Sequence, residues 1–235
     1  MAKYYLAHGH MVAVCSFEKT SDVASKIPSN LLYFQADVRD EAAMTAAVQA
    51  FNQKVSGIDL LICNAGISME KKAIPDFKKG KMVAEVNIIG VLNTIAPAVE
   101  IMKKQNSGHI VGIASFSSLV GLPGMAIYGG SKAFILNFFE SLNLDLKQYG
   151  IHTTCFVPGF IDTPLTQVNQ HKMPALVPLP TAIKIMTNAI AAKKELVFFP
   201  QRLAIVMKIL RLLPRFLYRA LMRLDLLGFR KQEHT

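Results

Sequence analysis

The chain has 235 residues, of which 51% are hydrophobic and 18% are charged, and these values exclude a disordered or fibrous protein. The formal net charge is +10, and most of the excess lies at the end of the chain, where residues 200–235 carry eight Lys or Arg against two Asp or Glu. Cys15, Cys63 and Cys155 lie far apart in apolar runs, which favours buried, reduced thiols in a cytosolic environment over a metal site.

The start of the chain does not have the pattern of a secretory signal, because Met-Ala-Lys-Tyr-Tyr is followed by only a few apolar residues before His8. A stretch without Asp, Glu, Lys or Arg runs from Gln105 to Ser131 and is long enough to cross a bilayer. It is rich in glycine and serine and changes from a strand-like to a loop-like pattern, so we predict no membrane-spanning helix there.

Short apolar runs alternate with longer segments of helical periodicity, which is typical of βαβ units around a parallel sheet. The predicted strands are Met11–Ser16, Leu31–Gln35, Leu60–Cys63, His109–Ser115, His152–Val157 and Leu196–Phe199. The predicted helices are Glu41–Phe51, Lys79–Lys104, Ala126–Tyr149 and Thr181–Ala192. With right-handed crossovers, this order predicts a Rossmann-like, doubly wound α/β sheet in one domain over residues 1–200.

The segment Gly159–Leu179 is rich in proline and has little periodicity. It lies between the predicted strand His152–Val157 and the predicted helix Thr181–Ala192. We interpret it as a substrate loop or lid, and a plain surface loop is the alternative.

Tyr128 and Lys132 stand four residues apart in a predicted helix and therefore share one face of it. A phenol titrates near pH ~10, and an ammonium group one turn away favours the phenolate, which moves the phenol toward acid–base catalysis. A pair at this spacing also arises by chance in a chain with many lysines, so the pair alone is a weak signal.

Ser115 ends a predicted strand, at the carboxyl edge of the sheet where open α/β folds bind ligands. A hydroxyl at this edge can hydrogen-bond a substrate carbonyl oxygen and stabilise the charge that develops on it during reduction. The alternative is a strand-end serine that satisfies backbone groups of the next loop, and Ser115 by itself favours that interpretation.

Three further segments complete a pattern. Asn64-Ala65-Gly66 follows one strand, Asn87 lies in a predicted helix, and Pro158-Gly159-Phe160-Ile161-Asp162-Thr163 follows another strand. Together with Ser115, Tyr128 and Lys132, these segments resemble the short-chain dehydrogenase/reductase family in order, spacing and context over roughly residues 1–200. One mild departure is Cys63, since the family often shows Asn-Asn-Ala-Gly, and a small buried residue can pack at that place.

The resemblance implies a role for each matching position. Tyr128 would be the general acid in reduction and the base in oxidation, and Lys132 would lower the Tyr128 pKa and bind the nicotinamide ribose. Ser115 would orient the carbonyl, and Asn87 would hold a water of the proton relay. Asn64, Ala65 and Gly66 would line the adenosine side of the cofactor and stabilise the central sheet, and Asp37 and Val38 would approach the adenine. Ser16 would lie at the adenosine ribose, and the nicotinamide would be framed by Pro158, Gly159, Ile161 and Thr163. The resemblance implies no metal.

The family's first strand and its Thr-Gly-x-x-x-Gly-x-Gly turn, which binds the pyrophosphate, have no counterpart in residues 1–235. Residues 2–10 instead resemble the end of the first helix leading into the second strand. Because the first strand of the family lies between the second and the fourth, we expect two unpaired interior edges in the sheet. We therefore also expect a segment upstream of Met1. The alternative is a degenerate relative that binds cofactor poorly or not at all.

Ser16 stands where an acidic residue would bind the ribose 2′-hydroxyl of NAD, so the resemblance leans toward NADP, with NAD as the second option. This preference for NADP is slight, because Phe17 and Glu18 follow Ser16, and neither is an arginine that would bind the 2′-phosphate.

The last segment, residues 201–235, is predicted to be a basic amphipathic helical tail. From Arg202 to Lys231 it contains two apolar helical stretches separated by Pro214, and the repeat of Arg211, Arg215, Arg219 and Arg223 every four residues predicts one basic face. Such a tail suits an anionic membrane surface, and the alternative is a helix pair packed over the substrate mouth or a dimer partner. Nucleic-acid binding is not predicted, because the basic stripe lacks interleaved aromatic platforms for bases.

The leading hypothesis is an oxidoreductase that transfers a hydride between NADP(H) or NAD(H) and a hydrophobic, lipid-like ketone or alcohol. The alternative is a non-catalytic relative that acts as a membrane-surface or scaffolding protein. We predict a homodimer or homotetramer, because the apolar residues of one helix exceed a single core-facing stripe, namely Phe134, Leu136, Phe138 and Phe139. The predicted location is the cytoplasm, with peripheral attachment to the cytosolic face of a membrane.

Overall fold

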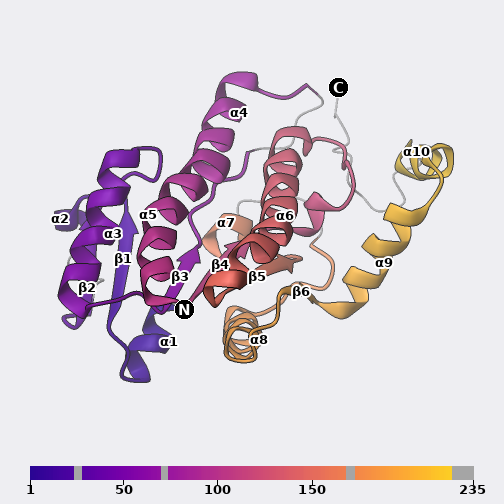
Figure 1. The fold of residues 1–235 in the computed structure, drawn as a ribbon. Coiled ribbons are helices and arrows are strands. Elements are labelled where there is room, and N and C mark those ends of the chain that lie inside the picture. The colour runs from indigo at the N-terminus through magenta and orange to yellow at the C-terminus, as the bar shows by residue number, and fades with distance from the viewer. Residues whose placement is uncertain (24–27, 70–73, 168–172, 224–235) are drawn as a thin grey trace.

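The computed structural model describes residues 1–23, 28–69, 74–167 and 173–223, and Figure 1 shows strands covered by helices on both sides. All the paired strands run parallel, as the sequence predicted. The strands are β1 (Val12–Ser16), β2 (Leu31–Gln35), β3 (Leu60–Cys63), β4 (Gly108–Ile113), β5 (Ile151–Pro158) and β6 (Leu196–Phe199). The fold is therefore the predicted Rossmann-like α/β fold.

The predicted helices are all present, and the helix around Asn87 contains a π-helical segment that the sequence did not predict. The short helices α2 and α7 were not predicted either, because four residues carry no periodic signal. The helices are α1 (Ala2–Ala7), α2 (Thr20–Val23), α3 (Glu41–Val55), α4 (Phe77–Ala84), the π segment η2 (Glu85–Ile89), α5 (Gly90–Gln105), α6 (Ala126–Leu146), α7 (Pro164–Gln167), α8 (Leu179–Ala191), α9 (Gln201–Leu212) and α10 (Arg215–Arg223), with 3-10 turns at η3 (Phe116–Ser118) and η4 (Lys147–Tyr149).

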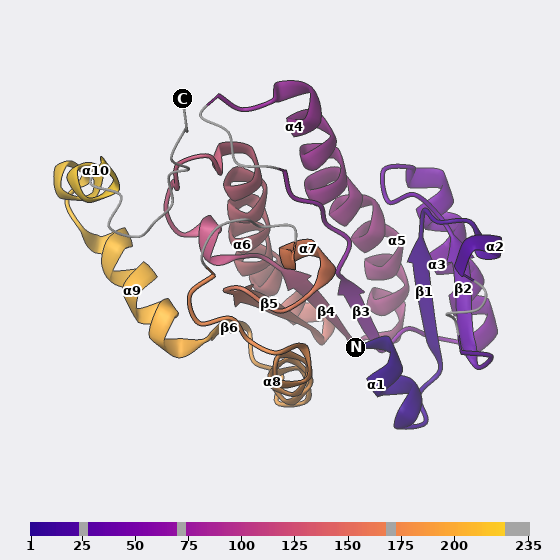
Figure 2. The ribbon, with the colours of Figure 1, turned by 180° about the vertical axis from the view of Figure 1, so that it is seen from behind.

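The described strands form two separate sheets, one with the order β1-β2 and one with the order β3-β4-β5-β6. Both views place β1, rather than β2, on the side of β3 (Figures 1 and 2). In the described part of the chain, β1 and β3 each therefore present an unpaired edge toward the interior of the fold. This confirms the predicted pair of unpaired edges, while the upstream segment stays a prediction.

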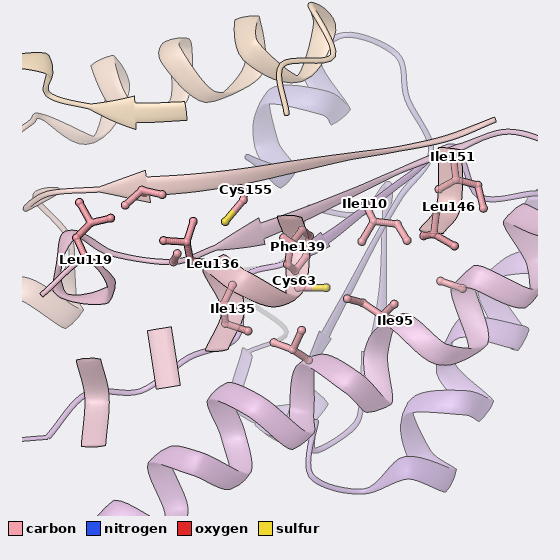
Figure 3. Close-up of a cluster of buried hydrophobic side chains, with 14 of the residues drawn as sticks. Cys63, Ile95, Ile110, Leu119, Ile135, Leu136, Phe139, Leu146, Ile151 and Cys155 are labelled. Carbon is pink, nitrogen blue, oxygen red and sulfur yellow. The ribbon is translucent and has the colours of Figure 1, made fainter. Parts of the chain in front are cut away.

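The main hydrophobic core lies between the four-stranded sheet and helices α5 and α6. Figure 3 shows Ile135, Leu136 and Phe139 of α6 beside Ile110 of β4 and Cys155 of β5, all of them buried. A second cluster covers the other face of the sheet, where α8 packs on side chains of β4 and β5. All three cysteines are free thiols; Cys63 and Cys155 are buried as predicted, whereas the prediction of a buried Cys15 is wrong, because its strand β1 leaves it only partly covered.

The continuous helix Phe77–Gln105 is, among the described helices, the one long and apolar enough to cross a membrane by length and composition. It packs against α3 and β3 and buries the polar side chains of Asn87 and Asn93. Part of its apolar surface, including Val91, Ile95 and Met102, therefore packs in the main core.

The predicted row of four arginines on one helical face is wrong for Arg211. This residue belongs to α9, whereas Arg215 and Arg219 belong to α10, and the extended backbone of Leu213 separates the two helices (ψ 141°). Pro214 causes the break, because it has no N–H to continue the helix and disfavours helical backbone at the residue before it. Residues 224–235 of the predicted tail lie outside the described residues.

The apolar side chains of α6 that suggested an oligomer are largely used within the chain. Leu136 and Phe139 are buried, and the half-buried rings of Phe134 and Phe138 stack with centroids 5.4 Å apart against the same core. Oligomerisation therefore stays a prediction.

Candidate active site

Ser115 lies just beyond β4, at the carboxyl edge of the sheet, where it caps the 3-10 turn η3. Its hydroxyl oxygen accepts a hydrogen bond from the backbone N–H of Ser117 (3.3 Å), and its carbonyl accepts one from the Ser118 hydroxyl (2.6 Å). The local capping interpretation of Ser115 is thus correct. The Ser115 side chain also acts to lower the pKa of the Tyr128 phenol, so the capping role and the candidate catalytic role coexist.

Tyr128 and Lys132 share one face of α6, as their spacing predicted. The Lys132 ammonium nitrogen lies 5.8 Å from the centroid of the Tyr128 ring and donates a hydrogen bond to the carbonyl oxygen of Ile113 at the end of β4 (2.8 Å). Lys132 is only 7% exposed. This hydrogen bond therefore ties α6, which carries Tyr128 and Lys132, to β4, the strand that precedes Ser115.

The pKa of Tyr128 moves in the direction opposite to the one predicted for a Tyr–Lys pair. Burial raises the pKa of the phenol above its ordinary value, and the hydrogen bond with Ser115 acts against this rise. Burial also lowers the pKa of Lys132 to about 8, and Cys155 acts in the other direction. In this arrangement Tyr128 is protonated at neutral pH, which suits a proton donor.

Asn87 lies in the π segment η2 and is 1% exposed. Its side-chain oxygen accepts from the N–H of Ile67 (2.8 Å), and its side-chain nitrogen donates to the Ile67 carbonyl (3.0 Å) and to the Ser131 hydroxyl (3.0 Å). Ser131 in turn donates to the carbonyl of Tyr128 (2.7 Å). Asn87 therefore connects the loop after β3 to the helix that carries Tyr128 and Lys132.

Asn64, Ala65 and Gly66 form that loop after β3. Asn64 and Ala65 are exposed, and Gly66 comes so near the site that a Cβ on it would lie 3.4 Å from both the Lys132 ammonium nitrogen and the Asn87 side-chain oxygen. The structure thus brings Gly66, Asn87 and Lys132 together.

Asp37 and Val38 follow β2 at the same edge of the sheet pair. The Asp37 carboxylate accepts hydrogen bonds from the Arg39 side chain (2.6–3.1 Å), and these hold the pKa of Asp37 below its ordinary value. The carbonyl of Val38 accepts from the buried Asn93 side chain (2.9 Å), and its side chain packs tightly against Gly90. Helix α5 therefore holds this candidate adenine segment in place.

Ser16 ends β1 next to this segment, because its carbonyl oxygen accepts from the N–H of Ala36 (2.8 Å). Its hydroxyl interacts with Glu18, donating to the carboxylate (3.3 Å) and accepting from the backbone N–H (3.4 Å). Ser16 and Asp37 therefore lie at the carboxyl ends of the paired strands β1 and β2. The unpaired edges of β1 and β3 separate them from Ser115 and Tyr128.

Pro158 and Gly159 close β5 beside the Ser115 turn. The Gly159 N–H donates to the carbonyl of Phe199 (2.8 Å), and a Cβ on Gly159 would lie 3.1 Å from both the Phe116 ring and the Leu203 side chain. Beyond them, Ile161 pairs with Val177 in an isolated bridge, and the hydroxyl of Thr163 donates to the Ile161 carbonyl (3.4 Å). Ile161 and Thr163 thus order the start of the predicted lid segment.

Several residues of the site escaped the sequence analysis. Ser131 and Asn93 are buried polar residues in helices, which was the available signal, yet their partners are distant in sequence. Gly129 lets α6 approach the Ser115 turn, because a Cβ there would lie 2.9 Å from the Ser117 carbonyl oxygen. Among the described residues, the Ser117 hydroxyl is buried without a hydrogen-bond partner.

The residues present fit two ends of a nicotinamide dinucleotide. An ammonium group has three donors, and in the described part of the chain Ile113 accepts one from Lys132, which leaves donors for ribose hydroxyls. Asp37 and Val38 offer an ordered segment for the adenine end. For the pyrophosphate, residues 1–235 provide no Thr-Gly-x-x-x-Gly-x-Gly turn.

The opposite end of the sheet differs from this site in its chemistry. A cavity of about 490 Å³ lies there, lined by residues at the amino ends of the strands such as Leu60, His109 and His152, and by Tyr4, Tyr5 and Lys193. The described residues contain no group of three or more His, Cys, Asp or Glu side chains arranged to hold a metal ion.

Comparison with known proteins gives the same family that the motifs resemble. A family model described as short chain dehydrogenase matches residues 1–174. An uncharacterized oxidoreductase of Myxococcus xanthus is 32% identical over 191 residues, which cover 80% of this chain and 75% of that protein. The 2-(R)-hydroxypropyl-CoM dehydrogenase of Xanthobacter autotrophicus is 33% identical over 180 residues, covering 71% of each chain.

Solved structures share the fold. The structure titled ElxO with NADP bound has a TM-score of 0.74 at 20% identity and covers 84% of this chain and 90% of its own. The 3-ketoacyl-(acyl-carrier-protein) reductase from Brucella melitensis complexed with NADH has a TM-score of 0.75 at 22% identity, with coverage of 84% and 89%.

Proposed function

The chain belongs to the short-chain dehydrogenase/reductase family of oxidoreductases, and we propose that it reduces a hydrophobic ketone, or oxidises the matching alcohol, through Ser115, Tyr128 and Lys132. The observation that carries this proposal is the arrangement of the three side chains: Ser115 acts on the Tyr128 phenol, and the Lys132 ammonium nitrogen, 5.8 Å from the centroid of the Tyr128 ring, is hydrogen-bonded to the end of β4. A nicotinamide cofactor, when bound, supplies or accepts the hydride.

In the proposed reduction, the Ser115 hydroxyl donates a hydrogen bond to the substrate carbonyl oxygen and Tyr128 donates its phenolic proton to that oxygen as the new C–H bond forms. The upward shift of the Tyr128 pKa supports the donor role, since it keeps the phenol protonated. Lys132 would hold the nicotinamide ribose, and Asn87 would keep α6 and the Gly66 loop in register through Ser131 and Ile67.

We propose NADP(H) as the preferred cofactor and NAD(H) as the second option. Ser16 supports this order, because no carboxylate stands at the end of β1 to bind a ribose 2′-hydroxyl. Structural relatives with bound NADP and with bound NADH are both known, which supports either choice. The segments that would contact the cofactor are Asp37–Val38, Asn64–Gly66, Pro158–Gly159 and, farther along, Ile161 and Thr163.

A hydrophobic substrate is supported by apolar side chains around the predicted lid. Leu165, Leu176 and Leu179 are exposed beyond the carboxyl end of β5, and the Phe116 and Phe198 rings stack beneath Gly159 (centroids 6.4 Å apart). We also propose a homodimer or homotetramer in the cytoplasm, attached peripherally to a membrane. A non-catalytic scaffolding role is not favoured, since all four candidate catalytic residues are present.

The test is the Tyr128→Phe variant, which removes one hydroxyl and keeps the ring. Reduction of a panel of hydrophobic ketones should fall by about 10²–10⁴-fold, while NADPH binding, followed by nicotinamide fluorescence, stays within about twofold of wild type. Tyr149→Phe, on the far end of the same helical unit, is the matched control and should leave turnover unchanged. Undiminished turnover in Tyr128→Phe would refute the assignment, and absence of NADPH binding to folded wild-type protein would favour the non-catalytic alternative.

A further inference from the structure

The surface of α9 and α10 combines exposed apolar and exposed basic side chains, and we refer to it as the tail surface. Its apolar members are Ile205, Val206, Ile209, Leu212, Phe216 and Leu217. Its basic members are Arg202, Lys208, Arg211, Arg215 and Arg219. Leu212 is 83% exposed and Phe216 is 70% exposed, so large apolar side chains on both helices face outward.

Helix α9 has two apolar faces, of which the fold uses one. Ala204, Met207 and Leu210 are buried in the main core. Ile205, Ile209 and Leu212, at spacings of four and three residues, form a second stripe on the opposite side of the same helix. A surface helix that packs on a core needs only one apolar face. The second apolar face of α9 therefore indicates a partner outside the described residues.

The charge on the tail surface identifies the kind of partner. Residues 201–222 contain five Lys or Arg and no Asp or Glu. Two copies of this face brought together would place ten cations around one contact without a compensating carboxylate. An anionic bilayer instead accepts apolar side chains between its headgroups and attracts each cation that flanks them.

We propose that the tail surface docks on an anionic membrane and thereby places the mouth of the active site against the lipid. This inference rests on the proposed function, because it names the source of the hydrophobic substrate. Both views show α10 at the end of the molecule where α4 and α6 begin, which is the carboxyl edge of the strands (Figures 1 and 2).

Direct contacts join the tail surface to the site. The Tyr218 hydroxyl of α10 donates a hydrogen bond to the carbonyl of Gly121, which follows the Ser115 turn. In the first turn of α9, Leu203 packs beside Gly159 and Phe116. The Lys208 ammonium nitrogen lies 4.3 Å from the centroid of the Phe198 ring, which stacks on Phe116. The two helices therefore pack directly against the Ser115 turn and the carboxyl end of β5.

The first test measures binding without turnover, by co-sedimentation of the full chain with vesicles of phosphatidylcholine alone or mixed with phosphatidylglycerol. Wild type should bind the anionic vesicles and not the zwitterionic ones, and high salt should weaken the binding. Each Lys or Arg near an anionic membrane surface raises the partition coefficient roughly fivefold, so the double variant Arg215→Gln/Arg219→Gln should reduce that coefficient by about 30-fold. The matched control Lys54→Gln/Lys147→Gln, which removes the same charge from α3 and η4, should change it by less than about twofold.

The second test uses the absence of tryptophan from the sequence. Phe216→Trp places a single indole on the tail surface, and its emission should shift to the blue when anionic vesicles are added. Leu144→Trp, at a position that is 75% exposed on α6, should show no shift. Equal shifts at both positions would indicate general adsorption and would contradict docking through α9 and α10.

Failure of this inference can be told apart from failure of the proposed function. With docking correct, Arg215→Gln/Arg219→Gln retains turnover of a water-soluble ketone and loses most turnover of a ketone dissolved in anionic vesicles. If wild type turns over both ketones but binds no anionic vesicles, the enzyme assignment stands and the membrane inference is refuted. If sedimentation shows a dimer that the Leu212→Ser variant dissociates, and wild type binds no vesicles, the tail surface binds a second copy of the chain instead.

Discussion

The ammonium group of Lys132 donates a hydrogen bond to the carbonyl oxygen of Ile113, two residues before Ser115 along the chain. This 2.8 Å contact joins the helix that carries Tyr128 to the strand that positions Ser115. A buried cation held in this way lowers stability unless a partner compensates it, and burial accordingly lowers its pKa to about 8.

The pKa of Lys132 gives a prediction for stability against pH. The unfolded chain holds this proton up to the ordinary value of 10.5, whereas the folded chain releases it near 8. Between these values the unfolded state binds more protons, so the free energy of unfolding of wild type, relative to Lys132→Met, rises with pH. Between pH of about 8 and 10.5, the free energy of unfolding of wild type should increase by a few kcal/mol relative to Lys132→Met, in order of magnitude. Urea unfolding at several pH values measures this difference. A difference that falls with pH would contradict the burial of Lys132.

Ser115→Ala removes the hydroxyl that contacts Tyr128. We expect kcat/KM for ketone reduction to fall by about 10²–10³-fold, because one preorganised donor to the carbonyl oxygen is lost. Removing the Ser115 hydroxyl also removes an influence that lowers the Tyr128 pKa, so the alkaline limb of the pH–rate profile should move to higher pH. The control is Ser117→Ala, whose hydroxyl has no partner among the described residues and whose loss should cost little stability.

Gly129 and Gly130 should respond oppositely to alanine. A Cβ at Gly129 would lie 2.9 Å from the Ser117 carbonyl oxygen, a backbone atom, so Gly129→Ala should destabilise the fold by about 1–3 kcal/mol and lower turnover by shifting α6 from the Ser115 turn. A Cβ at Gly130 has no heavy atom within 4 Å, so Gly130→Ala should stabilise the helix by about 0.5–1 kcal/mol. Thermal unfolding of both variants checks the pair, and equal effects would contradict the close packing of α6.

Asn87→Leu should be strongly destabilising, because it leaves the partly buried N–H and carbonyl of Ile67, and the buried Ser131 hydroxyl, without their Asn87 partner. We expect a loss of about 2–4 kcal/mol in the free energy of unfolding, measured with urea. Asn137→Ala, at an exposed position of α6, is the control and should change stability by less than about 0.5 kcal/mol. If Asn87→Leu were as stable as wild type, the connection between the β3 loop and α6 would not contribute to the fold.

Local periodicity was sufficient to predict the strands and most helices. The four-residue interval of Tyr128 and Lys132 places them on one face of any α-helix, and alternating apolar runs of strand length leave few other folds. The same interval was misleading for Arg211 and Arg215, because Pro214 ends the helix between them. Sequence spacing holds only while the secondary structure is continuous.

The sequence by itself determined which residue types could perform the chemistry and at which ends of strands they would lie. Only the tertiary structure decided how Asn87 reaches Ile67 and Ser131, how closely Gly129 approaches Ser117, and why the Tyr128 pKa rises. It also decided that α9 buries one apolar stripe and exposes another. The physical reason is that periodicity is a local property of the chain, whereas burial and hydrogen-bond partners depend on segments that are distant in sequence and meet only in the folded state.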